Sequence, residues 1–404
     1  MSWRLLGACL LLAAPPAAAG EPAPTVILLS WDGVRHDLPD RAELPALRRM
    51  ERDGARAERL TPPFPSNTFP GHATLATGTH PDRHGIVDNR FFDPEAGEFD
   101  YENDARWLEA EPLWVAAERQ GVRSAVLFWV GSETDWHGVS PSWRVAPFDA
   151  SLGEDAKVDR LLAWLDLPEP KRPHLLMSWW HGADRAGHRA GPDDPAVAAA
   201  LAGQDAALAR LLAGIDARGL WPHTTLLVVS DHGMARAGPA HDAAAVLAAA
   251  GVAARVASGG GVAHVYLEDP GALEAARAAL DALPGVEAFA RDALPERLRA
   301  RHRRGGDVVA LATPPVRFAR TGGGSWWRQL VQRLRPSDGV HGYDPARPEM
   351  AGVLLALGRG VPRGRRLPPV HAVDVAPTVA ALLGIAPPRS AEGAAFLPLE
   401  ADPR

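Results

Sequence analysis

The sequence predicts an α/β protein with a doubly wound, mostly parallel central sheet flanked by helices. Three short apolar runs end abruptly in polar residues, as buried parallel strands do, at 25–30, 175–178 and 225–230. Helical patterns lie between them, at 44–53, 113–120, 155–165 and 196–217. Strands that alternate with helices in this way are typical of a parallel sheet covered on both faces.

The sequence pattern changes between residues 242 and 337. Strand-like segments at 263–267 and 307–312, a helix-like segment at 273–282 and a basic stretch at 291–304 indicate a small α+β insertion. The core pattern resumes with a strand at 350–357 and a helix at 374–383, where Pro377 suits the first helical turn. We therefore expect a core formed by residues 20–241 and 338–404, interrupted by an insertion at 242–337.

The first 19 residues resemble a secretory signal peptide. One arginine precedes an apolar run that ends in small residues, and two prolines leave the run too short for a membrane span. No later segment has 18 consecutive apolar residues, so we expect no membrane span and export to the periplasm or the medium after cleavage near Ala19. A loose lipoprotein-like box at Cys9 gives the alternative of a lipid anchor.

Composition excludes several classes of protein. With 46% apolar and 23% charged residues, the chain is neither a coiled coil, a collagen-like fibre nor a wholly disordered tail. The formal net charge is −6, and the positive charge lies almost entirely on dispersed arginines, so we expect no specific nucleic-acid binding. Cys9 is the only cysteine, so the mature chain has no disulfide of its own. The sequence leaves the oligomeric state open.

Acidic and histidine residues gather where the predicted strands end. Each cluster lies close to a glycine, and the six residues concerned are Asp32, Asp184, His188, Asp231, His232 and His341. Taken singly, each has an ordinary structural alternative, such as a strand-end cap or a core histidine. Taken together at one sheet edge, three carboxylates and three imidazoles suffice for two divalent ions, and nitrogen and oxygen ligands without thiolates favour zinc.

Thr68 is expected at, or just before, the start of a helix. Pro70 suits the first helical position, and the free N–H groups and dipole of a helix N-terminus favour an alkoxide or a phosphate. A plain N-cap is the alternative. A threonine hydroxyl becomes a good nucleophile only when a metal or a base removes its proton.

Six short motifs occur in a fixed order along the chain. They are Asp32-Gly33, residues 66–72 (SNTFPGH), 85–89 (GIVDN), 184–192 (D-x-x-G-H-x-x-G-P), 230–234 (SDHGM) and 341–344 (HGYD). In this order and spacing, from about residue 25 to 384, the chain resembles the nucleotide pyrophosphatase/phosphodiesterase family of the alkaline phosphatase superfamily. The core would then be an alkaline-phosphatase-like catalytic core.

The resemblance implies two zinc ions per chain and a threonine nucleophile. One zinc would be held by Asp184, His188 and His341. The other would be held by Asp32, Asp231, His232 and Thr68, which is the implied nucleophile. Asn89 would hydrogen-bond a phosphoryl oxygen.

The implied reaction is hydrolysis of phosphodiester or phosphoanhydride bonds of nucleotides through a phosphothreonine, with release of a nucleoside 5′-monophosphate. The chain departs from the family pattern at Trp179, where relatives have a tyrosine, at His181-Gly182 in place of an acidic pair, and at Ala183 in place of a proline. These changes leave the substrate open. The alternatives are a phosphomonoesterase or a phospholipid-head-group hydrolase on the same scaffold, or a non-catalytic metal- or carbohydrate-binding protein.

Four aromatic residues are expected to line the substrate cleft: Phe69, Phe91, Phe148 and Trp179. Phe69 follows the implied nucleophile directly, and stacking on a nucleobase contributes about 1–3 kcal/mol. The alternative is that Phe69 and Trp179 are core residues. The other histidines, including His36, His72, His181 and His241, are expected to be structural or surface residues.

Overall fold

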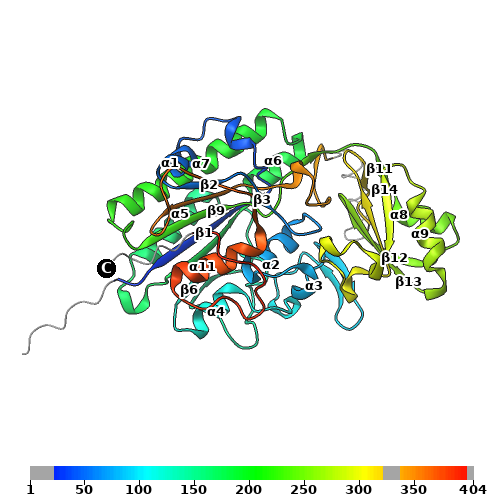
Figure 1. The fold of residues 1–404 in the computed structure, drawn as a ribbon, viewed down its shortest axis with the longest axis horizontal. Helices are drawn as coiled ribbons and strands as arrows, with labels where there is room; N and C mark the ends of the chain where they lie inside the picture. The colour runs from blue at the N-terminus through cyan, green and yellow to red at the C-terminus, as the bar shows by residue number, and fades with distance from the viewer. Residues whose placement is uncertain (1–21, 322–336, 398–404) are drawn as a thin grey trace, which may run out of the picture.

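An eight-stranded sheet forms the centre of the computed structural model, which describes residues 22–321 and 337–397 (Figure 1). The predicted signal peptide and Cys9 lie outside the described residues. In spatial order the strands are β19 (Arg365–Leu367), β2 (Ala55–Ala57), β18 (Leu354–Gly358), β9 (Thr224–Val229), β1 (Thr25–Trp31), β8 (Leu175–Trp180), β6 (Ser124–Leu127) and β7 (Trp143–Val145). Only β18 runs antiparallel to its neighbours in this described sheet. The predicted fold class is confirmed.

Helices cover both faces of this sheet. One face carries α1 (Pro45–Asp53), α5 (Glu154–Leu165) and α7 (Pro195–Ala217), and the other carries α2 (Thr68–Thr77), α4 (Leu113–Arg119) and α11 (Val375–Leu383). Along β1, Val26 and Leu28 pack into the core beneath α2, α4 and α11, whereas Ile27 and Leu29 pack beneath α1, α5 and α7. Burial on both faces explains why the central strands read as continuous apolar runs.

Helix α7 is long and apolar enough to cross a membrane by length and composition alone. Its residues Leu201, Leu208 and Leu211 are buried against the central sheet, and the helix packs against α1, α5 and α6 (Gly182–Ala190). A core helix of a globular α/β protein has this composition, so α7 is explained by its packing.

The edges of the sheet differ most from the sequence-based expectation. The strand expected at 350–357 begins only at Leu354, because Pro348–Met350 form a 3-10 turn in front of it. Two short strands at one end of the sheet, β19 at its edge and β2 next to it, escaped prediction because three residues, RRL and ARA, are too few to show an apolar period.

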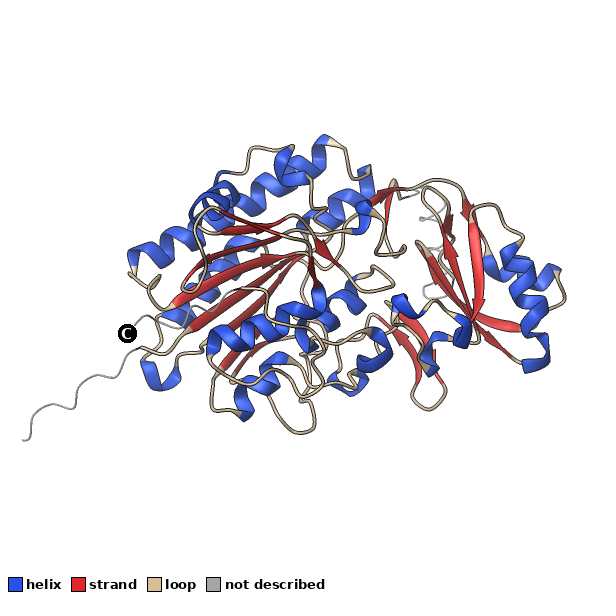
Figure 2. Cartoon of the chain, viewed as in Figure 1, coloured by secondary structure: helices blue, strands red, loops and turns tan. Residues whose placement is uncertain are grey.

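A second, four-stranded antiparallel sheet lies beside the first (Figure 2). Its strands, in spatial order, are β12 (Ala254–Gly259), β13 (Val262–Leu267), β15 (Val308–Ala312) and β14 (Val286–Ala290). One face packs on α8 (Ala243–Ala249) and α9 (Leu273–Asp281). The other packs on Phe64, Leu294 and Leu298. All six of these elements fall between residues 242 and 337.

Short strand pairs and one short helix complete the connections. The pairs are β3 (Leu60–Thr61) with β20 (Val370–His371), β4 (Arg90–Asp93) with β5 (Gly97–Asp100), β10 (Ala235–Arg236) with β17 (Gly339–Val340), and β11 (Ala240–His241) with β16 (Arg317–Phe318). The short helix is α3 (Pro81–His84). Because β10 and β17 pair, the chain returns from the second sheet next to the end of β9.

Arg304 connects the two sheets through a buried guanidinium. Its Nε bonds the carboxylate of Asp93, and its Nη1 donates at 2.8 Å to the carbonyl oxygens of both Gly85 and Trp107. Asp93 is fully buried and also pairs with Arg303, whose own side chain is 43% exposed. Removing Arg304 would therefore leave two carbonyl groups without this donor, and would leave the buried Oδ2 of Asp93 with the exposed Arg303 as its remaining charge partner.

We expect Arg304→Met to lower the free energy of unfolding by about 3–5 kcal/mol, since it breaks a buried ion pair by removing one partner. Arg303→Met is the matched control, because it removes an exposed partner of the same carboxylate, and should cost about 1 kcal/mol or less. Urea unfolding followed by tryptophan fluorescence measures both. Equal losses in the two variants would contradict the role given to Arg304.

Candidate active site

The ends of three neighbouring strands bring the acidic residues together. Strand β1 lies between β8 and β9, with Ser30 opposite both Trp179 and Val229. Asp32 follows β1, Asp231 follows β9, and helix α6 begins directly after β8. Since parallel strands present their carboxyl ends at one edge, these residues converge there.

Helix α6 carries Asp184 and His188, one turn apart. The Nε2 atom of His188 lies 3.4 Å from Oδ1 of Asp184 and 3.1 Å from Nε2 of His341, which follows β17. The ligand atoms of these three residues all lie within 4.8 Å of one another. This spacing suits one metal ion.

A second group lies deeper and shares Asp184 with the first. One ligand atom from each of Asp32, Asp184 and His232 lies within 4.8 Å of the others. Nε2 of His232 is 3.4 Å from Oδ1 of Asp32 and 3.3 Å from Oδ2 of Asp231. Asp184 therefore stands between the two groups, and all six residues predicted as metal ligands are brought together.

Unpartnered oxygens in this cluster fit a metal. Oδ1 of Asp32, Oδ1 of Asp184 and Oδ2 of Asp231 are buried without a hydrogen-bond partner among the described residues. Burial and the charges of Asp231 and Asp184 raise the pKa of Asp32 well above its ordinary value. A cation between these carboxylates would partner the unpaired oxygens and would also offset the burial and repulsion that raise the pKa of Asp32.

The imidazoles are also oriented so that they could bind a metal. In each ring, Nδ1 faces a backbone carbonyl: that of Gly339 for His188 at 3.0 Å, that of Gly233 for His232 at 2.8 Å, and that of Ser66 for His341 at 3.2 Å. A carbonyl only accepts, so each Nδ1 carries the proton and each Nε2 presents a lone pair to the cluster. Burial and the neighbouring imidazoles also lower the pKa of His341, which keeps its ring neutral.

Close approach of the backbone makes two glycines necessary here. Gly33 has φ +69°, and a Cβ on it would come within 2.9 Å of the Cβ of Asp184. Gly342 has φ +90°, and a Cβ there would come within 2.7 Å of Oδ1 of Asn67. Any side chain at either position would be strained and would push a neighbour of the cluster away.

Thr68 is the first residue of helix α2, with Asn67 as its N-cap. Its hydroxyl oxygen lies 3.2 Å from Nε2 of His232, so it reaches the second group of ligands. Its side chain is almost fully buried, which shields the hydroxyl from bulk water. In this first turn the N–H of Phe69 bonds Asn89, that of Gly71 bonds the carbonyl of Asn67, and Pro70 has none, so the backbone N–H of Thr68 is the donor left beside that hydroxyl.

A family model described as type I phosphodiesterase/nucleotide pyrophosphatase matches residues 26–344, most of the chain. The chain belongs to this family. The resemblance read from the six motifs is thereby confirmed.

Individual relatives give the same assignment. An uncharacterised pyrophosphatase/phosphodiesterase of Schizosaccharomyces pombe is 41% identical over 219 residues, 52% of this chain and 45% of that protein. A bis(5′-adenosyl)-triphosphatase of Xenopus laevis is 27% identical over 374 residues, 90% of this chain and 78% of that protein. This phosphodiesterase-family chain thus spans less than half of the first relative.

A solved structure has the same fold. Murine ectonucleotide pyrophosphatase/phosphodiesterase 5, in an inactive threonine-to-alanine variant in complex with AMP, superposes with a TM-score of 0.81 at 24% identity. The match covers 90% of this chain and 96% of that one.

Asn89 of this phosphodiesterase-family chain is fixed beside Thr68. Its Oδ1 accepts a hydrogen bond from the backbone N–H of Phe69 at 2.8 Å, and its backbone N–H donates to Oδ1 of Asp88 at 2.6 Å. With the side-chain oxygen already used, the amide Nδ2 is left as a donor, 3.5 Å from the hydroxyl of Tyr101.

The four aromatic residues expected at the substrate cleft divide into two sets. Phe69 and Phe91 are nearly fully buried, and both rings pack on Phe99. Trp179 stacks on the half-buried Phe148, with ring centroids 4.6 Å apart. The stacking of a nucleobase on these residues stays a prediction.

Tyr101 and His72 are site neighbours that sequence reasoning missed. Tyr101 is 44% exposed and packs edge-on against Phe69 at 5.3 Å. His72, expected to be structural, lies with Nδ1 3.3 Å from Oδ2 of Asp231. Although burial raises the pKa of Asp231, the imidazoles of His232 and His72 bring it down to about 2. The SNTFPGH motif was the available signal for His72.

Trp179 also contacts the cluster of candidate metal ligands directly. Its indole Nε1 donates to Oδ2 of Asp32 at 2.8 Å, which leaves Oδ1 of that carboxylate facing the site. Its backbone carbonyl accepts from the buried Nζ of Lys157 at 2.9 Å. Burial lowers the pKa of Lys157 to about 8. The tryptophan therefore orients a ligand, whatever its contact with substrate.

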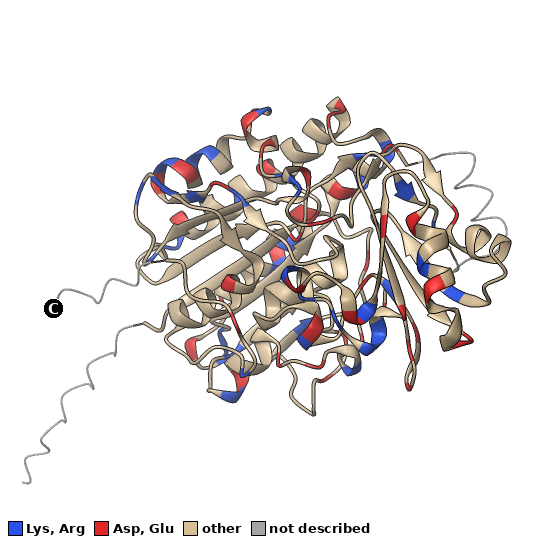
Figure 3. Cartoon of the chain, turned by 45° about the vertical axis from the view of Figure 1, so that its right-hand side comes forward, with Lys and Arg blue, Asp and Glu red and all other residues tan. Residues whose placement is uncertain are grey.

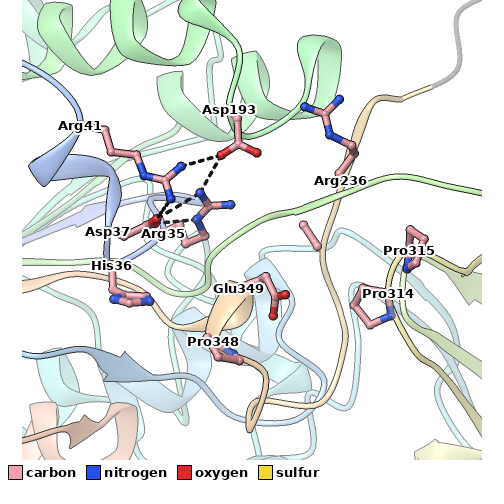
Figure 4. Close-up of a pocket in the computed structure, with 11 residues that line it drawn as sticks. Arg35, His36, Asp37, Arg41, Asp193, Arg236, Pro314, Pro315, Pro348 and Glu349 are labelled. Carbon is pink, nitrogen blue, oxygen red and sulfur yellow. Dashed lines mark hydrogen bonds and ion pairs between the residues drawn. The ribbon is translucent and has the colours of Figure 1, made fainter.

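A cavity of about 540 Å³ lies elsewhere and contains none of the six ligands (Figure 4). Two of its arginines, Arg35 and Arg41, pair with Asp37 and Asp193. Their charges are thus already neutralised. Over the described chain as a whole, positive and negative residues are interspersed along helices and loops (Figure 3).

We expect Trp179→Phe to weaken zinc binding by about 10-fold or more, since it keeps an aromatic ring but removes the N–H that orients Asp32. Trp180→Phe is the matched control, because its indole donates only to Ser178 at 3.1 Å. Competition with a chromogenic chelator measures both affinities. Unchanged zinc affinity in Trp179→Phe would refute this orienting role.

Proposed function

We propose that this chain is an exported two-zinc phosphodiesterase or nucleotide pyrophosphatase that releases a nucleoside 5′-monophosphate. The observation that carries the proposal is the position of the Thr68 hydroxyl, at a helix N-terminus and 3.2 Å from His232 within the six-residue ligand cluster. Family membership supports phosphodiester or phosphoanhydride bonds as the target. Export rests on the signal-like first 19 residues.

Two ions would divide the ligands between them. One would be held by Asp184, His188 and His341, and the other by Asp32, Asp231, His232 and Thr68. When bound, such ions lower the pKa of a coordinated hydroxyl and neutralise charge on the phosphoryl oxygens. The neutral imidazoles and unpartnered carboxylate oxygens described above are the form of the ligands that binding requires.

The chain supplies the nucleophile and the donors. The deprotonated oxygen of Thr68 attacks phosphorus in line, a phosphothreonine forms, and the bond to the leaving group breaks, with a proton from solvent completing that group. Asn89 Nδ2 donates to an equatorial phosphoryl oxygen, and the backbone N–H of Thr68, the first residue of α2, is a second donor on the same side. Water then attacks the phosphothreonine, which releases the monophosphate and returns the proton to Thr68.

Access to the site comes from the side of His188. Its side chain is 38% exposed, whereas those of Asp231 and His232 are fully buried. A substrate would therefore approach over Asp184 and His188 and reach Thr68 from there. Two similar proteins support nucleotides as substrates. One is named a bis(5′-adenosyl)-triphosphatase, and the other was solved in complex with AMP.

A substrate comparison tests the proposed reaction. The purified zinc-loaded protein should hydrolyse bis-p-nitrophenyl phosphate and dinucleoside polyphosphates much faster than p-nitrophenyl phosphate, with a nucleoside 5′-monophosphate as product. Removal of metal with a chelator should abolish the activity, and zinc should restore it. Faster hydrolysis of the monoester, or of phospholipid head groups, would favour the alternative activities on the same scaffold.

We expect Thr68→Ala to reduce kcat by about 10³-fold or more while the two zinc ions are largely retained, because the nucleophile is lost but only one ligand with it. Ser66→Ala is the matched control. Its hydroxyl donates to the backbone carbonyls of Tyr343 and Pro63 and faces away from this chemistry. Steady-state kinetics with metal analysis measures both. An inactive Ser66→Ala beside an active Thr68→Ala would overturn the assignment.

A further inference from the structure

A chain of polar contacts runs from the predicted metal ligand His341 to the second sheet. Nδ1 of His341 lies 2.6 Å from Oδ1 of Asn67, and Nδ2 of Asn67 donates to Oδ1 of Asp88 at 2.6 Å. Oδ2 of Asp88 lies 3.3 Å from Nε2 of His264, in the middle of strand β13. Figure 1 shows β12 and β13 at the right of the molecule, apart from the larger sheet, with α3 between the two sheets in this view.

All four members of this chain are buried. Each is 7% exposed or less, so bulk water does not compete for their hydrogen bonds. In a buried network, loss of one partner leaves another polar group unsatisfied and changes its neighbours' orientation.

The proton positions follow from Asn67. Oδ1 of Asn67 and the carbonyl of Ser66 both face Nδ1 of His341, so this nitrogen carries the proton and Nε2 is free to bind metal. An ionised carboxylate can only accept, so Asp88 must face the amide nitrogen of Asn67 and not its oxygen, which fixes the amide orientation. A flipped amide would present Nδ2 to His341 and favour the tautomer with its proton on Nε2.

Asp88 also holds the neighbouring phosphoryl-contact residue. Its Oδ1 accepts from the backbone N–H of Asn89 at 2.6 Å, and Asn89 in turn accepts from Phe69. One carboxylate thus orients the imidazole of His341, through Asn67, and fixes the backbone of Asn89.

His264 faces that carboxylate from the other sheet as a charge partner. Its Nδ1 lies 3.0 Å from the carbonyl of Gly305, which fixes the ring with Nε2 toward Asp88. The contact at Nε2 is an ion-pair distance and no hydrogen bond, and it holds the carboxylate when the ring carries both protons. The strand that bears it lies between β12 and β15, so it is held on both edges. The second sheet therefore reaches the ligand cluster at two points: this imidazole, and the backbone N–H of Gly261 between β12 and β13, which donates to the carbonyl of His341 at 3.0 Å.

We propose that Asp88 and His264 are positioning residues for the metal centre, which set the tautomer of His341 and the place of Asn89. This inference rests on the proposed metal-dependent phosphodiester hydrolysis. It assigns the four-stranded sheet a part in metal binding, although the sheet contributes no ligand of its own to the six-residue cluster.

The test measures zinc affinity of the full chain by competition with a chromogenic chelator. Asp88→Asn, which keeps the shape but lets the side chain donate to Asn67, and His264→Gln should each weaken zinc binding by about 10–100-fold. In both variants kcat at limiting zinc should fall together with the zinc affinity. Excess zinc should restore the activity of His264→Gln.

Tyr266→Phe is the matched control on the same strand. It removes the hydroxyl that donates to the carbonyl of Arg304 at 2.6 Å and accepts from the N–H of Phe92, so it loosens the same interface outside the network. Its zinc affinity should stay within about twofold of the parent. Should Asp88→Asn fail to fold, the comparison of His264→Gln with Tyr266→Phe decides.

Two results overturn the inference: unchanged zinc affinity in His264→Gln, or a loss in Tyr266→Phe equal to that in His264→Gln. Failure of the proposed function looks different. In that case the parent chain binds zinc and His264→Gln binds it more weakly, but neither hydrolyses a phosphodiester.

Discussion

Mutual repulsion among three buried carboxylates, at one edge of the central sheet, is the constraint on which the rest of the site depends. Asp32, Asp184 and Asp231 each keep one buried oxygen that accepts no hydrogen bond from the described part of the chain. Like charges held together in a medium of low dielectric repel one another, and a cation bound between them would remove that repulsion. The strand register that brings them together and the glycine at 33 that lets Asp184 approach therefore suit a metal centre.

Orientation of the ligands is the task of the residues around them. Backbone carbonyls hold the imidazoles with Nε2 toward the cluster, and the indole of Trp179 selects which oxygen of Asp32 faces it. These partners carry no metal chemistry themselves. They remove the freedom of the ligands before a metal binds, so less ordering is required at binding.

The two sheets divide this work. The larger one supplies the strand ends that carry ligands, whereas the smaller one contributes side chains at a distance, with Arg304 at the interface and His264 facing Asp88. Its buried contacts with the segment that bears Asn89 explain how a sheet without ligands in the cluster can still influence the site. Coupling of this kind needs only contiguous packing and hydrogen bonds.

The fold class, the family and the set of six clustered residues were predictable from the sequence, because short motifs and apolar periodicity are local properties. The same local signals gave no warning that Trp179 donates to Asp32, that His72 touches Asp231, or that Asp88 joins Asn67 to His264. They also placed the start of β18 four residues early. Contacts such as that between Asn67 and His341 link residues 274 positions apart, and only the path of the folded chain decides such distances.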